Sequence, residues 1–314
     1  MRRYAPYPPY PTLFHLFCWL ALLLAGVASA APARVVILAS NDARPYSQCA
    51  EGFAASLQNR AALDIQTVQL AGNEDQAAKA ARQVAADKPA LVLTLGKLAT
   101  EAVLEHAPGV PVVAGLLLDA QLLRAPNVTG VPLEHPPEVE LQWLRRLLPE
   151  ATQVGVIYDP VRDAARIERL KSAATPFGLT IVAEPVTAPA DLPGALEQLS
   201  RHAQVMLGIP NPELFSPRTA RPILLFSFRN RIPFVGLTSA WVKAGAIYAL
   251  DWDYTDMGAQ LGELAERILN GAAASSLDPQ PPRRVRFSVN EKTAGHMRLD
   301  IPQPWRQQAA ETFE

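Results

Sequence analysis

The chain has 314 residues, of which 49% are hydrophobic and 19% charged, a composition that suits a globular protein with room for two cores. The formal net charge is -1, and loss of Arg2 and Arg3 with a leader would leave 27 basic and 30 acidic residues, a charge of -3. Because there is no basic excess, we expect no nucleic-acid partner and no attraction to an anionic membrane surface.

Residues 1–30 have the pattern of a cleavable export signal. Two arginines stand in front, an apolar run occupies residues 16–27, and an Ala-Ser-Ala tripeptide that ends at Ala30 supplies the small residues of a cleavage site. The apolar run is too short to span a bilayer, which takes about twenty residues. We expect an exported, periplasmic protein whose mature N-terminus lies near Ala31.

Beyond residue 31, short aliphatic runs alternate with helical patterns through two halves of the chain. In the first half we predict strands at 34–39, 64–70, 90–95 and 111–117, separated by helices at 49–59, 74–86 and 97–106. In the second half we predict strands at 153–158, 180–186, 204–209 and 233–237, with helices at 162–175, 189–201 and 217–230. The strands start about 20–30 residues apart, the length of a βαβ unit. The alternation predicts an α/β fold of two Rossmann-like lobes with parallel sheets covered on both faces.

Three segments have the pattern of connections between the lobes. Residues 127–134 form a strand-like stretch followed by prolines, and a helix at 138–148 opens lobe two. Residues 246–251 are strand-like again and precede a helix that ends at Gly271, and a Pro-rich linker at 278–282 precedes a last strand at 284–289. Two lobes joined by several strands make a hinge.

These patterns predict a division of the chain into four parts. We expect a signal peptide at 1–30 and a C-terminal tail at 303–314. Lobe one comprises residues 31–130 with about 252–280, and lobe two comprises 131–251 with about 283–302.

Candidates for ligand binding follow from a general property of parallel sheets. Solutes bind beyond the carboxyl ends of the strands, near the point where the strand order reverses. The predicted strand ends of lobe one carry Asn41, Asp42, Thr94, Gly96, Lys97 and Asp119. Those of lobe two carry Tyr158, Asp159, Asn211, Ser239 and Trp241, and Asp251 stands at the second connection. We expect a small molecule to bind between the two sets.

The turn that contains Thr94, Gly96 and Lys97 joins a strand to a helix. Free backbone amides and the helix dipole at such a turn favour an anion such as a carboxylate. The alternative is that Thr94 caps the helix and Lys97 is solvated. Asp119 and Asp159 are suited to an ammonium group, and equally to turns.

Aromatic and short polar side chains complete the set of candidates. Tyr158, Trp241 and Trp252 offer ring faces on which a cyclic ligand can stack, although aromatic residues at strand ends also pack in cores. Asn211 and Ser239 are suited to hydrogen bonds with an enclosed solute, and equally to ordinary turns.

Sequence signatures of catalysis and metal binding are lacking. There is no G-x-G-x-x-G motif after the first strand, no P-loop and no G-x-S-x-G elbow, on which nucleotide chemistry and acyl transfer depend. The histidines beyond the leader are too scattered to share a metal ion, and we expect them at the surface: His106, His135, His202 and His296. We therefore predict no catalytic residue, no metal site and no cofactor.

The order of these elements and three short stretches resemble the ABC-transporter substrate-binding proteins of the tryptophan/tyrosine-type group. The stretches are Asp-Lys-Pro-Ala-Leu-Val-Leu at 87–93, Asn-Val-Thr-Gly-Val at 127–131 and Val-Asn-Glu-Lys-Thr-Ala at 289–294, and the resemblance covers roughly residues 34–302. It implies a monomer with the type I periplasmic binding fold that takes up a small solute, in some members an aromatic amino acid. The solute would pass to a permease and its ATPase in the inner membrane.

The chain departs from this family at two strand ends. Members that bind amino acids tend to have hydroxyl and carboxylate residues where this chain has Thr-Leu-Gly-Lys at 94–97 and Ile-Pro-Asn-Pro-Glu at 209–213. A different ligand, such as another carboxylate, stays open. So does a sensing role, in which the closed protein is presented to a signalling receptor, and a hydrolase or reductase on a similar frame is a third alternative.

The leader generates a first prediction. Expressed with its own leader, the protein should be soluble in the periplasm, and N-terminal sequencing should start at or near Ala31. Membrane-bound material that starts at Met1 would contradict this expectation.

Overall fold

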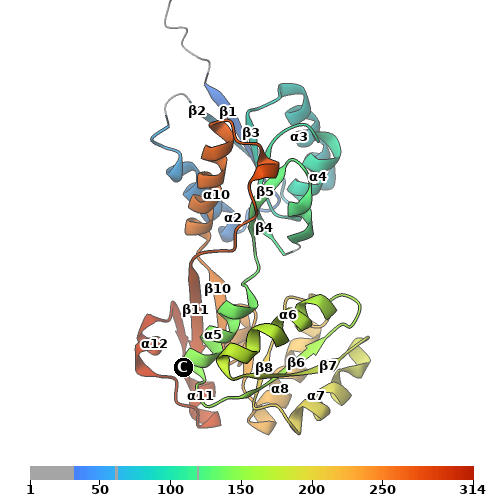
Figure 1. Cartoon of the computed structure of the whole chain (residues 1–314), viewed down its shortest axis with the longest axis vertical. Coiled ribbons are helices and arrows are strands. Elements are labelled where there is room, and N and C mark those ends of the chain that lie inside the picture. Colours follow the sequence, from blue (N-terminus) through green and yellow to red (C-terminus); the bar gives the residue numbers. More distant parts are fainter. Residues whose placement is uncertain (1–31, 61–62, 119) are drawn as a thin grey trace, which may run out of the picture.

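The computed structural model describes residues 32–60, 63–118 and 120–314, so the predicted signal peptide and Asp119 lie outside the described residues. Two α/β lobes are joined by a narrow waist (Figure 1). One lobe contains a five-stranded sheet and the other a seven-stranded sheet, and most strand pairs are parallel. The predicted fold class is confirmed.

Lobe one is built on the parallel sheet β2-β1-β3-β4-β5. Its strands are β1 (Ala33–Ala39), β2 (Leu63–Gln69), β3 (Leu91–Leu95), β4 (Val112–Leu117) and β5 (Val128–Pro132). Its helices are α2 (Arg44–Ser56), α3 (Glu74–Asp87), α4 (Lys97–His106) and α10 (Tyr254–Leu269). Alternate residues of β1 enter different cores, because Val35 and Ile37 pack towards α2 and α10 while Val36 and Leu38 pack towards α3 and α4.

Lobe two is built on the sheet β12-β11-β10-β9-β8-β6-β7. Its strands are β6 (Gln153–Tyr158), β7 (Thr180–Pro185), β8 (Val205–Leu207), β9 (Phe234–Gly236), β10 (Tyr248–Trp252), β11 (Val285–Asn290) and β12 (Glu311–Phe313). Its helices are α5 (Pro137–Leu147), α6 (Ala164–Ala174), α7 (Leu192–Ser200), α8 (Pro217–Asn230), α9 (Ser239–Ala244), α11 (Glu291–Met297) and α12 (Gln303–Gln308). Strand β11 runs antiparallel to β10.

The last residues differ from the expected tail. Residues 303–314 form α12 and β12, and β12 adds to the edge of the sheet of lobe two beside β11. Trp305 packs edge to face against Trp143, with 5.4 Å between ring centroids. A strand of three residues is too short to produce an alternating pattern that sequence reading can detect.

The chain crosses the waist three times. It leaves β5 for α5 through residues 133–136, it leaves β10 for α10 at Asp253, and it returns to β11 through the Pro-rich residues 278–284. Because α10 packs on α2, the second crossing returns the chain to lobe one after most of lobe two is complete (Figure 1).

Glycines bring α10 and α2 into backbone contact. A Cβ atom at Gly258 would lie 2.1 Å from the carbonyl oxygen of Cys49, and a Cβ atom at Gly52 would lie 2.1 Å from that of Thr255. A Cβ atom at Gly262 would lie 1.8 Å from the Ser56 hydroxyl oxygen. Only glycine allows helices to approach so closely. These contacts hold the returning helix against lobe one.

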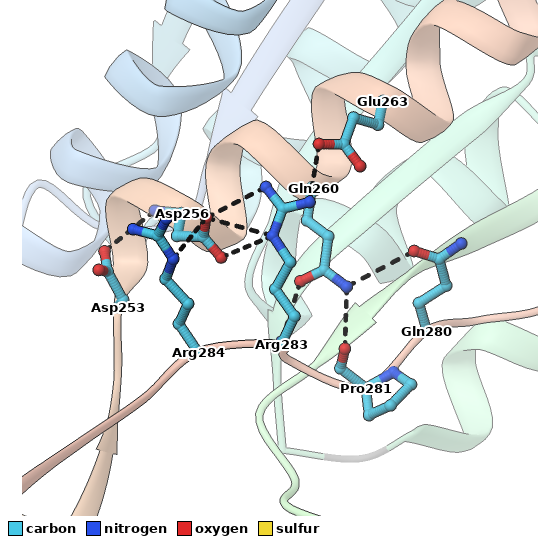
Figure 2. Close-up of polar contacts among 8 residues, drawn as sticks. All are labelled: Asp253, Asp256, Gln260, Glu263, Gln280, Pro281, Arg283 and Arg284. Atoms are coloured by element: carbon cyan, nitrogen blue, oxygen red, sulfur yellow. Dashed lines mark hydrogen bonds and ion pairs between the residues drawn. The ribbon is translucent and has the colours of Figure 1, made fainter.

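The third crossing is fastened to the same helix (Figure 2). The guanidinium of Arg283 donates hydrogen bonds to both carboxylate oxygens of Asp256, with Nε 2.9 Å from Oδ2, and to Glu263 at 2.8 Å. The side-chain amide of Gln260 donates to the carbonyl oxygen of Pro281 at 2.9 Å and accepts from the backbone of Arg283 at 3.2 Å. The second and third crossings are therefore both attached to α10.

The glycine contacts generate a stability prediction. Gly258→Ala should lower the free energy of unfolding by about 1–3 kcal/mol, because the added methyl group must displace backbone atoms of α2. The measurement is urea unfolding followed by circular dichroism. Gly295→Ala on α11 is the matched control, since a Cβ atom there meets nothing within 4 Å, and it should be neutral or stabilising. Equal stability of the two variants would contradict the packing argument.

Candidate functional site

The topology directs the carboxyl ends of both sheets to the waist. Strand β5 leaves lobe one at its carboxyl end, and β1, β3 and β4 run parallel within the same sheet. Strand β10 leaves lobe two at its carboxyl end, and β9, β8 and β6 run parallel to it. The two sets of strand ends therefore meet between the lobes, the position where parallel sheets bind ligands.

A cavity of 220 Å³, which we call the interlobe pocket, lies at this waist. Lobe one contributes the start of α2, including Arg44. Lobe two contributes Ser239, Arg286 and Glu311, and Asp251 lines the pocket from the end of β10. The pocket therefore combines two basic and two acidic side chains on elements of both lobes.

Asp251 also shapes the second crossing. Its Oδ1 atom accepts hydrogen bonds from the backbone of Trp252 at 2.8 Å and from the Tyr254 hydroxyl at 3.2 Å. Burial and the nearby Asp251 carboxylate raise the pKa of Tyr254 above its ordinary value. Tyr254 therefore stays a neutral donor, and it holds the carboxylate at the rim of the interlobe pocket.

A second, smaller cavity of 30 Å³ shares Trp252 with the interlobe pocket. We call it the Trp252 cavity. Its wall is mostly apolar, and its polar side chains are those of His135, Glu140, Tyr248 and Trp252. His135, from the first crossing, stacks on Trp252 with 5.2 Å between ring centroids and 13° between planes. The first and second crossings thus contact each other at this cavity.

Several polar atoms around the Trp252 cavity are buried without partners. In the described part of the chain, neither ring nitrogen of His135 makes a hydrogen bond of ordinary geometry, and the Tyr248 hydroxyl and Trp252 Nε1 also lack partners. His135 is 5% exposed and Tyr248 is 1% exposed. Because an unsatisfied buried polar group costs about 1–3 kcal/mol, these atoms need partners from outside the chain, which ordered water or a ligand can supply.

An ionic cluster lies beside the same cavity. Arg166 of α6 donates from Nη2 to both carboxylate oxygens of Glu140 on α5, at 2.8 and 2.9 Å, and from Nη1 to Glu134 in the first crossing. Burial raises the pKa of Glu140 to about 7, with a smaller contribution from the Glu134 carboxylate, while the Arg166 charge opposes this rise. Burial and the Arg166 charge lower the pKa of His135 to about 4, against a small opposing effect of the Asp251 backbone. His135 is therefore neutral at pH 7.

The structure gives the lobe-one candidates mostly internal partners. Thr94 is buried and accepts a hydrogen bond from the Thr100 hydroxyl at 2.9 Å. Gly96 is the N-cap residue that precedes α4, with φ of +88°, and the side chain of Lys97 is 70% exposed and lies 3.5 Å from Glu101. The hydroxyl of Ser40 accepts from the amide of Ala99 at 3.0 Å, so one of the free amides at this turn is already bonded.

The β1 turn is similar. Asn41 accepts a hydrogen bond from the backbone of Ala43 at 2.8 Å, and Asp42 is exposed. Asp119 lies outside the described residues.

The lobe-two candidates divide into two groups. Asp159 accepts from the backbone of Val161 at 2.7 Å, and Asn211 donates to Asp163 at 2.8 Å and accepts from two backbone amides of its own turn. Tyr158 and Trp241 pack against the core. Ser239 and Asp251 line the interlobe pocket. Trp252, the third candidate that the structure brings to a described cavity, lines both the interlobe pocket and the Trp252 cavity, and the roles of the other candidates stay predictions.

Sequence reading missed the Trp252 cavity. His135 was expected at the surface, but the structure buries it under Trp252 because the first and second crossings meet there. A usable signal existed in Tyr248, which stands inside an apolar run that reads as a buried strand and so brings a hydroxyl into a core. Glu140 and Arg166 similarly adjoin the apolar faces of their helices.

The described residues contain neither a cluster of metal ligands nor a membrane-spanning helix. Among them, no group of three or more His, Cys, Asp or Glu side chains is arranged to hold a metal ion. No helix within the described ranges is long and apolar enough to cross a membrane.

Comparison with known sequences finds relatives across almost the whole chain. Residues 34–313 match the family described as ABC transporter substrate binding protein. The chain is 22% identical over 224 residues to a tyrosine-binding protein of Clostridioides difficile (strain R20291). This match takes in 68% of the chain and 64% of the length of that relative.

Solved structures with the same fold are also found. One is the ligand-free, open structure of a substrate binding protein with adhesive properties from Clostridium difficile, with a TM-score of 0.73, 18% identity, and coverage of 90% of this chain and 99% of that chain. Another is an ABC domain in complex with L-Trp from Streptococcus pneumonia, with a TM-score of 0.59, 18% identity, and coverage of 89% and 100%. At these identities the likeness establishes the fold.

His135 and Glu140 should give the free energy of unfolding opposite pH dependences, and the variants His135→Gln and Glu140→Gln should show each of them separately. The lowered pKa of His135 means that the unfolded state binds more protons between about pH 4 and 6.5, so this residue makes the free energy of unfolding rise with pH. The raised pKa of Glu140 means that the folded state binds more protons between pH 4.5 and about 7. This residue therefore makes the free energy of unfolding fall as the pH rises.

Relative to wild type, His135→Gln should therefore lose stability as the pH rises from 4 to 6.5, by up to about 3 kcal/mol. Glu140→Gln should gain stability relative to wild type between pH 4.5 and 7. Urea unfolding at half-unit pH steps measures both slopes. Parallel curves for wild type and both variants would contradict the burial of these groups.

Proposed function

Since the chain belongs to the family of ABC transporter substrate binding proteins, as its resemblance predicted, we propose that it is the periplasmic solute-binding component of an ABC importer. It would close its two lobes on one small solute at the waist and present the closed form to a permease with its ATPase. The observation that carries this proposal is the interlobe pocket, because its lining comes from α2 of lobe one and from α9, β11 and β12 of lobe two.

The charges of the interlobe pocket favour a zwitterion or another small carboxylate. Arg44 and Arg286 can bind a carboxylate, and α2 begins beside the pocket and adds the positive end of its dipole. Asp251 and Glu311 can bind an ammonium group. The names of two similar proteins, a tyrosine-binding protein and a complex with L-Trp, make aromatic amino acids the first solutes to test.

Closure would follow from the way the crossings are held. A solute in contact with Arg44 on lobe one and Ser239 on lobe two binds best when the lobes are together, so it stabilises the closed state by its difference in affinity. The clamp of Arg283 on Asp256 fastens the third crossing to α10, and the second crossing continues directly into the same helix, so the ends of both crossings at α10 would move with lobe one (Figure 2). The expected motion is a bend at the waist.

A solute screen tests this proposal. In a thermal-shift panel of amino acids that includes L-Trp and L-Tyr, with small carboxylates and vitamins, at least one compound should stabilise the mature protein. A solute at a hundred times its dissociation constant adds about 2.7 kcal/mol. Small-angle scattering should show a smaller radius of gyration with that solute.

Arginine variants locate the site. Arg286→Ala should weaken the compound found in the screen at least tenfold by calorimetry, a loss of about 1.4 kcal/mol. Arg229→Ala, at an exposed position of α8 that lines neither cavity, is the matched control and should bind as wild type. Failure of every compound to stabilise the protein, or equal binding by both variants, would contradict the proposed function at this pocket.

A further inference from the structure

Apart from Glu140, the polar side chains around the Trp252 cavity are uncharged, and together they offer both hydrogen-bond donors and acceptors. Neutral His135 has one donor and one acceptor nitrogen, the Tyr248 hydroxyl can do both, and Trp252 Nε1 donates. In the described chain the Tyr248 hydroxyl and Trp252 Nε1 lack partners, and neither ring nitrogen of His135 makes a hydrogen bond of ordinary geometry. A guest that has both a donor and an acceptor would satisfy the largest number of them.

The cavity has room for a small group and no free charge to neutralise one. Its 30 Å³ exceeds the roughly 10–15 Å³ that a single water needs. The one charged side chain in its wall is Glu140, and both oxygens of that carboxylate already accept hydrogen bonds from Arg166. Leu207, Val235 and Leu250 supply apolar wall, where an unpaired charge would be strongly disfavoured.

We propose that the Trp252 cavity is a second subsite that receives an uncharged hydrogen-bonding group of the solute, such as a hydroxyl or a carboxamide. This inference rests on the proposed function. It assigns different parts of the solute to two cavities that are both lined by the indole ring of Trp252. The interlobe pocket binds the charged end of the solute with Arg44, Arg286, Asp251 and Glu311. The Trp252 cavity selects among solutes by their neutral end.

A tyrosine at position 248 is better explained by binding through its hydroxyl than by packing of its ring. Tyr248 is buried within β10, and phenylalanine would fill the same space without an unsatisfied hydroxyl. We therefore expect Tyr248→Phe to melt at the same temperature as wild type or higher. A subsite predicts that the same variant loses affinity for neutral hydrogen-bonding probes.

Three probes of one shape test the charge preference. Acetamide, acetate and acetamidinium differ in charge but have nearly the same size. In ¹H–¹⁵N spectra of the mature protein, the indole N–H signal of Trp252, assigned with Trp252→Phe, should shift and saturate with acetamide. Acetate and acetamidinium can bind in the interlobe pocket, which Trp252 also lines, so any shift that they cause should be the same in Tyr248→Phe as in wild type. The signals of Trp143 and Trp305, which pack against each other and line neither cavity, are internal controls.

The variants complete the test. Tyr248→Phe should raise the acetamide dissociation constant at least fivefold while its melting temperature is maintained or raised. The subsite is overturned if acetamide gives no saturable shift, which would mean that the cavity holds ordered water only. It is also overturned if Tyr248→Phe weakens either charged probe as much as it weakens acetamide, or if Tyr248→Phe binds acetamide as wild type does.

The outcomes also separate this inference from the proposed function. If acetamide binds at Trp252 but no compound of the thermal-shift panel stabilises the protein, the subsite stands and the proposed function fails. If a panel compound binds and Arg286→Ala weakens it, while acetamide leaves Trp252 unchanged, the proposed function stands and the subsite fails.

Discussion

Helix α10 packs against lobe one although the chain has built most of lobe two before reaching it, and this return determines the rest of the architecture. The contact depends on Gly52, Gly258 and Gly262, where no side chain fits between the backbones of α2 and α10. Once α10 is held there, the chain must cross the waist a second time to reach it and a third time to leave. Arg283 and Gln260 then attach the third crossing to the same helix.

The waist that results gathers buried polar groups that two separate lobes would not need. His135 and Glu134 arrive on the first crossing and Trp252 on the second, and they meet Glu140, Arg166 and Tyr248 of lobe two. Some of these groups are well paired and others have no partner in the described chain. Since burial shifts the pKa values of His135 and Glu140 in opposite directions, their contributions to stability change oppositely with pH and partly cancel.

The alternation of apolar runs and helices was sufficient to predict two α/β lobes, because both periods are local properties of the sequence. The site was harder, because a polar residue at a strand end can bind its own turn as readily as a ligand. Asn211 and Asp159 do so here, and Ser40 caps α4 at the turn proposed for an anion. The burial of His135 depends on Trp252, which is far away in sequence, so no local pattern reveals it.

Natural cores rarely keep polar atoms without partners, and those that remain tend to mark positions where folding and function make opposite demands. At the waist, the hydrogen bonds of Arg166 go to Glu134 and Glu140 and not to His135 or Tyr248. That arrangement holds the first crossing to lobe two and leaves the neutral donors and acceptors free. Under the proposed function, a solute group in the Trp252 cavity would gain hydrogen bonds that the protein alone does not make, in addition to the contacts with both lobes that favour closure.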